Sequence, residues 1–107
     1  MINEPPFGLP PAAVEKIRGV FACHPQVERA VLYGSRAKGN YKNGSDIDLT
    51  LYGDALDLSL LLKILGELDD LLLPWMFDVS IYKQIDNESL REHIERVGIT
   101  FYEKKNG

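Results

Sequence analysis

Apolar residues along the chain recur at two spacings, one typical of α-helices and the other typical of β-strands. After Pro11, which suits the first turn of a helix, apolar residues recur every three or four positions, and this predicts a helix over about 11–23. A similar line of apolar residues precedes Gly98, a typical helix stop, and predicts another helix. Ser89 and Glu92 form a possible capping box at the start of that helix. The pattern therefore predicts helices near both ends of the chain.

The leucine-rich middle of the chain predicts a further helix. Either Asp54 or Asp57 can cap its first turn, and a proline at position 74 requires the helix to end earlier. The residues that follow one helical stripe are Leu58, Leu61, Leu62, Leu65, Leu68 and Leu72. Leu60, Ile64 and Leu71 make this stripe wider than one side of a small sheet usually needs. The stripe is either a broad core contact or a surface that binds a partner or a second copy of the chain.

Between the helical stretches lie short segments with the composition and period of strands. Residues 27–34, VERAVLYG, are rich in β-branched and aromatic residues and stop at a glycine. Residues 46–53, DIDLTLYG, and 76–82, MFDVSIY, follow a period of two that places apolar residues on one face and mostly polar residues on the other. Residues 99–103, ITFYE, follow as a possible edge segment. Three strands are expected, with a fourth possible.

The order of these elements predicts an α/β fold. Helices alternate with strands, and a short helical turn is possible in SRAKG after the first strand. We expect a small mixed β-sheet of three or four strands flanked by helices. At 107 residues the chain has the size of one domain, which we place at 11–107, after a proline-rich arm at 1–10.

Composition narrows the range of functions. The formal net charge of −4 gives no broad attraction for nucleic acid. Cys23 is the single cysteine, which excludes an intramolecular disulfide and a cysteine-based zinc cluster and fits a reducing cytoplasm. The first residues lack a secretory signal pattern, and charged residues interrupt the longest apolar segment. We therefore expect a cytoplasmic protein that binds neither nucleic acid nor membranes.

Two aspartates stand at alternate positions on the polar face of the second predicted strand. Asp46 and Asp48 lie about 6.6 Å apart along the chain and point the same way. Mg²⁺ prefers oxygen ligands and commonly takes one or two carboxylates plus substrate phosphates. Asp78, on the polar face of the third strand, can supply another carboxylate. Because neighbouring carboxylates repel one another unless cations neutralise them, the pattern predicts a magnesium site.

A possible phosphate-binding turn precedes the two aspartates. Gly34 allows a phosphate to approach backbone N–H groups closely, and the hydroxyl of Ser35 can donate to a phosphate oxygen. Arg36 and Lys38 can add positive charge near the same phosphates. A metal site beside an anion-binding turn indicates phosphoryl or nucleotidyl transfer.

Together, GSRAKGNYKNGSDIDL and the later FDVSIY resemble the motif pattern of the DNA polymerase beta-like nucleotidyltransferase superfamily, and the short chain resembles its minimal nucleotidyltransferase (MNT) group. The resemblance covers nearly all of the chain after the arm. It implies that Asp46 and Asp48 bind two magnesium ions, and that Asp78 completes the site and helps to deprotonate the attacking hydroxyl. The residues implied in nucleotide binding are Gly34, Ser35, Arg36, Lys38 and Ser45. Members often have arginine where Lys38 stands, and lysine lacks the bidentate fork.

The resemblance also implies a substrate and a partner. Minimal members of the group are similar in arrangement to antitoxins encoded beside a HEPN-domain toxin, a helical ribonuclease. ATP would be the substrate, and AMP would be transferred to a tyrosine of the toxin. We expect a protein acceptor, since the sequence offers no second domain to hold a small one. Two alternatives remain open: a module that neutralises its partner by contact alone, and a nucleotidyltransferase for a small-molecule acceptor.

Overall fold

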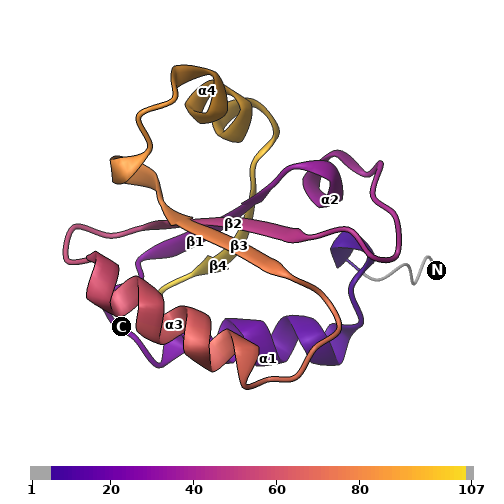
Figure 1. Cartoon of the computed structure of the whole chain (residues 1–107), viewed down its shortest axis with the longest axis horizontal. Coiled ribbons are helices and arrows are strands. Elements are labelled where there is room, and N and C mark those ends of the chain that lie inside the picture. Colours follow the sequence, from indigo (N-terminus) through magenta and orange to yellow (C-terminus); the bar gives the residue numbers. More distant parts are fainter. Residues whose placement is uncertain (1–5, 106–107) are drawn as a thin grey trace.

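A four-stranded sheet separates two layers of helices in the computed structural model, which describes residues 6–105 (Figure 1). The elements in chain order are η1 (Pro6–Gly8), α1 (Pro11–Ala22), β1 (Arg29–Tyr33), α2 (Ser35–Lys38), β2 (Ile47–Tyr52), α3 (Leu58–Asp69), β3 (Phe77–Ile81), η2 (Tyr82–Gln84), α4 (Glu88–Val97) and β4 (Ile99–Glu103). This architecture confirms the expected small mixed sheet flanked by helices.

The sheet has the strand order β3-β2-β1-β4. β1 is antiparallel to both of its neighbours, whereas β2 and β3 are parallel. Parallel strands need a crossover connection, and α3 provides it between β2 and β3. The segment 99–103 is the edge strand β4, as its sequence indicated.

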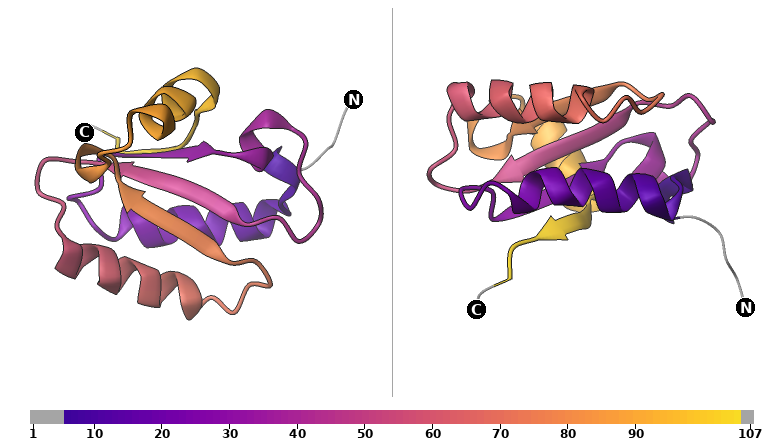
Figure 2. Two further views of the ribbon diagram at one scale, coloured as in Figure 1. Left: turned by 45° about the horizontal axis from the view of Figure 1, so that its top comes forward. Right: turned by 90° about the horizontal axis from the view of Figure 1, so that it is seen from below.

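The main core lies between the sheet and the pair of helices α1 and α3, which cover the same face (Figures 1 and 2). Ile17 and Phe21 of α1 are fully buried, as is Ile64 of α3. They meet alternate residues of the strands, including Leu32 and Leu49. Burial of each such side chain contributes about 1.5–3 kcal/mol relative to exposure, so this layer supplies most of the stabilising apolar contact.

The opposite face of the sheet carries α4 and a smaller apolar cluster (Figure 1). The buried residues of this cluster are Val31, Tyr33, Ile85 and Ile94. Farther along, the rings of Tyr52 and Tyr82 stack with centroids 4.6 Å apart. Arg29 lies over Tyr52 and Arg91 lies over Tyr82, at 4.4 and 5.0 Å from the ring centroids. Arginine and tyrosine side chains thus form one continuous stack that connects α4, through Arg91, to the sheet.

The leucine-rich helix α3 is rotated relative to the predicted stripe. Asp57 is its N-cap and accepts a hydrogen bond from the N–H of Leu60 at 2.9 Å. The buried side is centred on Ile64 and Leu68, while Leu58 and Leu62 are 61% and 59% exposed. Leucines lie on nearly all sides of this helix, so their spacing alone did not predict which side faces the core. Leu72 is also exposed, at 89%.

The predicted capping box of the last helix is wrong. The N-cap of α4 is Asn87, whose side-chain oxygen accepts a hydrogen bond from the N–H of Leu90 at 3.1 Å. Ser89 lies inside the first turn instead. Asparagine is as good an N-cap as serine, and the chain uses the earlier residue.

Residues 1–5 of the predicted arm lie outside the described residues. From Phe7 onward the chain packs on the domain: Leu9 is fully buried, and the ring of Phe7 lies 5.5 Å from that of Phe101. Within residues 6–105, none of the helices is both long and apolar enough to span a membrane.

Candidate active site

A row of three polar side chains crosses the sheet on the face that carries α4. Tyr33 of β1 pairs in register with Asp48 of β2, and Asp48 pairs with Asp78 of β3. Side chains alternate between the two faces of a strand, so all three point away from the main core. Asp46 is exposed and stands one residue before β2 begins. The sheet therefore places the predicted aspartates on neighbouring strands.

Asp48 is the aspartate whose protonation the fold changes most clearly. The pKa of its carboxyl is raised from 3.8 to about 6, first by burial and then by the charges of Asp78 and Asp46. The pKa of Tyr33 is also raised, by burial first and then by Asp78 and Asp48. Among the described residues, the one ion pair joins His24 and Glu67. The aspartates thus repel one another without a paired cationic side chain.

The turn after β1 lies directly against Asp48. Gly34 has φ +77° and ψ −156°, and a Cβ on this residue would overlap a carboxylate oxygen of Asp48. Ser35 then begins the short helix α2. Only glycine combines this backbone conformation with such a close approach. The two halves of the sequence motif therefore meet in one site.

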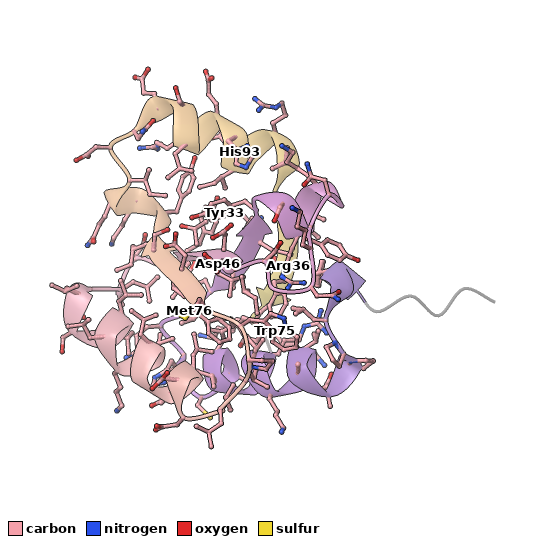
Figure 3. All side chains as sticks on the ribbon, turned by 45° about the vertical axis from the view of Figure 1, so that its right-hand side comes forward. Tyr33, Arg36, Asp46, Trp75, Met76 and His93 are labelled. Carbon is pink, nitrogen blue, oxygen red and sulfur yellow. The ribbon has the colours of Figure 1, made fainter. Side chains whose placement is uncertain are left out.

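His93 of α4 is a member of the site that the sequence did not indicate. The N–H of Gly34 donates a hydrogen bond to Nε2 of His93 at 3.3 Å. The imidazole also stands edge-on to the ring of Tyr33, with centroids 6.1 Å apart (Figure 3). A lone histidine 59 residues from its partner carries no signal in the sequence. The N–H group of Gly34, which was expected to bind a phosphate, is therefore hydrogen-bonded to His93 in this structure.

Arg36 does not point its donors toward the expected phosphates. Its side chain is only 2% exposed, and its guanidinium donates to the carbonyl oxygens of Phe7, Asn43 and Ser45 at 2.9–3.2 Å. A phosphate contact would require these hydrogen bonds to break. In this structure Arg36 organises the loop between α2 and β2 instead of contacting phosphate.

The remaining predicted nucleotide ligands lie around that loop. Lys38 is the exposed last residue of α2. The hydroxyl of Ser45 accepts a hydrogen bond from the N–H of Lys42 at 2.8 Å, which leaves its own proton free for donation. Both residues are positioned near the motif, and their contacts with a nucleotide stay predictions.

The aspartates provide a donor set that fits Mg²⁺ without enclosing it. Within residues 6–105, no group of three or more His, Cys, Asp or Glu side chains is arranged to hold a metal by itself. Mg²⁺ commonly binds through one or two carboxylates and takes its other oxygen ligands from water and substrate phosphates. The crowded, unneutralised carboxylates of Asp46, Asp48 and Asp78 fit that mode of binding. Such a site would be completed by the triphosphate of a nucleotide.

The sequence matches one family of known proteins over most of its length. Residues 15–107 match the model of the polymerase beta nucleotidyltransferase domain. The chain belongs to this nucleotidyltransferase family. No curated protein matches the sequence. The matched residues include Gly34, Asp46, Asp48 and Asp78.

Solved structures share the fold of this nucleotidyltransferase domain at low sequence identity. A toxin–antitoxin complex with AMP-PNP has a chain with TM-score 0.69 and 20% identity, over 86% of this chain and 74% of that one. A complex of a tri-AMPylated HEPN toxin from Shewanella oneidensis with an MNT antitoxin has a chain with TM-score 0.65 and 18% identity, over 87% of this chain and 71% of that one. A protein assigned as a nucleotidyltransferase from Sulfolobus solfataricus has TM-score 0.55 and 20% identity, over 89% of this chain and 80% of that one.

Proposed function

We propose that this domain transfers AMP from ATP to a tyrosine hydroxyl of a partner HEPN toxin and thereby acts as an antitoxin. The observation that carries the proposal is the register of Asp48 with Asp78, directly beside the turn at Gly34. It is supported by membership of the nucleotidyltransferase family. It is supported further by structural neighbours that are toxin–antitoxin complexes, one holding AMP-PNP and one an AMPylated HEPN toxin.

The residues of the site have separate tasks in this reaction. Asp46 and Asp48 would hold Mg²⁺, which supplies charge neutralisation at the triphosphate and the leaving pyrophosphate. Asp78 accepts a hydrogen bond from the acceptor hydroxyl and takes up its proton. The hydroxyl oxygen forms a bond to the α-phosphorus while the bond from that phosphorus to the bridging oxygen breaks, and pyrophosphate leaves. The protein contributes chiefly position and electrostatics.

Exposed apolar side chains on and after α3 favour a protein acceptor over a small molecule. Leu58 and Leu62, one helical turn apart on α3, are largely exposed, and so are Leu72 and Met76 on the connection to β3. α3 packs against β3, which carries Asp78 and forms an edge of the sheet. Exposed large apolar side chains are typical of protein interfaces. We propose that the partner binds over these four residues.

A protection assay separates this proposal from neutralisation by contact alone. Cells expressing the partner HEPN toxin are supplied with the wild-type domain or with a variant carrying Asp46→Asn, Asp48→Asn and Asp78→Asn. The proposal predicts that the triple variant binds the toxin but gives no protection. Full protection by the triple variant would assign neutralisation to binding. ATP turnover with a purified small alcohol and no protein partner would favour the small-molecule alternative.

A further inference from the structure

Arg36 is a buried cation whose hydrogen bonds all go to backbone carbonyls. Nε donates to the carbonyl of Ser45 at 3.0 Å, and Nη2 donates to the same oxygen at 2.9 Å. Nη2 also reaches the carbonyl of Asn43 at 3.2 Å, and Nη1 reaches that of Phe7 at 2.9 Å. Burying a guanidinium is costly unless its donors are satisfied, and here three carbonyl oxygens from two backbone segments satisfy them. The side chain therefore joins α2, the N-terminal segment and the loop before β2.

Aromatic rings enclose the same guanidinium. Its central carbon lies 5.3 Å from the ring centroid of Tyr41 and 5.7 Å from that of Trp75. The indole Nε1 of Trp75 donates to the carbonyl of Asn43 at 2.9 Å, so this oxygen receives hydrogen bonds from both side chains. The loop is thus fixed by the guanidinium of Arg36 and by the indole of Trp75, two residues before β3.

The loop held in this way ends at Asp46. The carbonyl of Ser45, immediately before Asp46, is fixed by Arg36. The N–H of Ile47, immediately after Asp46, donates to the carbonyl of Met76 at 2.9 Å. Asp46 has an exposed side chain, yet its backbone is fastened on both sides. Its position relative to Asp48 depends on these two attachments.

We infer that Arg36 is a positioning residue: it fixes the loop over residues 40–46 and thereby holds Asp46 in place to bind a metal ion. The inference rests on the proposed function for the role of the metal, whereas the order of the loop can be measured by itself. Lysine cannot replace Arg36, because one ammonium group cannot reach three carbonyl oxygens in a planar fork. A phosphate-binding arginine would instead leave the loop unchanged when it is substituted.

Arg36→Lys tests the inference, with Arg18→Lys as the matched control. Arg18 likewise donates to a backbone carbonyl, that of Phe101 at 2.8 Å, and lies over the ring of Phe101, away from the aspartates. Amide hydrogen exchange is measured over 40–46, and binding of Mg²⁺ and of metal-free ATP is measured by titration. We expect Arg36→Lys to lose protection in this loop and to weaken Mg²⁺ binding by about tenfold, with a smaller effect on the binding of metal-free ATP. Arg18→Lys should leave all three unchanged.

Two outcomes would overturn the role of Arg36. Unchanged protection from hydrogen exchange over 40–46 in Arg36→Lys would show that the order of the loop does not depend on the hydrogen bonds of the guanidinium. Weaker binding of metal-free ATP with an intact loop would make Arg36 a phosphate ligand. If Arg36→Lys does not fold, Trp75→Phe removes the indole donor to Asn43 and leaves a smaller ring beside Arg36. A smaller loss of protection in the same loop is then expected. A wild-type protein that transfers no AMP would defeat the proposed function and leave these measurements interpretable.

Discussion

The carboxylate of Asp48 lies so close to the Cα of Gly34 that a side chain on the turn would overlap it. Gly34→Ala therefore pushes a methyl group toward the central carboxylate and also strains a backbone with φ +77°. We expect a loss of stability of about 1–3 kcal/mol, measured by urea unfolding. We expect transfer activity to fall further than this destabilisation explains, because Asp48 must move.

Gly66→Ala is the control for this substitution. Gly66 lies inside α3, and a Cβ there would have no neighbour within 4 Å. Alanine in an exposed helix interior should stabilise the protein by about 0.5–1 kcal/mol and leave transfer unchanged. Equal effects of the two substitutions would contradict the close packing of the turn against Asp48.

Asp48→Asn should stabilise the metal-free protein at high pH. The pKa of Asp48 is raised to about 6 in the folded state from 3.8, so folded protein holds this proton more tightly than unfolded protein does. Stability of the wild type should therefore fall as pH rises from about 4 to about 6. Two pKa units correspond to about 3 kcal/mol, and partial exposure reduces the expected gain to about 1–2 kcal/mol at pH 8.

Urea unfolding in EDTA at pH 4 and pH 8 measures this effect. The gain from Asp48→Asn should be present at pH 8 and vanish at pH 4, where the wild-type carboxyl is largely protonated. Asp86→Asn, at an exposed position outside the row of aspartates, is the control and should show no such gain. A variant less stable than the wild type at pH 8 would mean that Asp48 is already neutralised without metal.

His93→Ala should impair the use of ATP. Without the imidazole, the N–H of Gly34 loses its hydrogen-bond acceptor and the turn loses an attachment to α4. Loss of about 1 kcal/mol predicts a fall of about fivefold in kcat/KM for ATP. His93→Gln keeps an acceptor and should retain more activity. Tighter ATP binding by His93→Ala would instead mean that the imidazole competes with the nucleotide.

The exposed leucines of α3 should matter for partner binding and little for folding. The double substitution of Leu58 and Leu62 by lysine places charge on side chains that are 61% and 59% exposed. We expect the affinity for the toxin, measured by calorimetry, to fall by at least about tenfold with unfolding unchanged. Ser59→Lys, at another exposed position of the same helix, is the control. Undiminished affinity would place the interface elsewhere.

Local patterns predicted the sheet and the aspartates well, because both depend on alternation along single strands. The period of two put Asp48 and Asp78 on polar faces, and the strand register then made them neighbours. The inward side of α3 could not be predicted, since leucines occupy nearly all of its circumference. The contacts of Arg36 and His93 join distant segments through backbone groups, which leave no trace in the pattern of side chains.

Intact-mass analysis of the partner toxin tests the central claim most directly. The toxin is incubated with ATP, Mg²⁺ and the wild-type domain, Asp48→Asn or Asp86→Asn, and its mass is then compared with that of untreated toxin. We predict that the wild type and Asp86→Asn add one or more AMP units to the toxin and that Asp48→Asn adds none. An unmodified toxin after incubation with folded wild-type domain, or full modification by Asp48→Asn, would contradict the account.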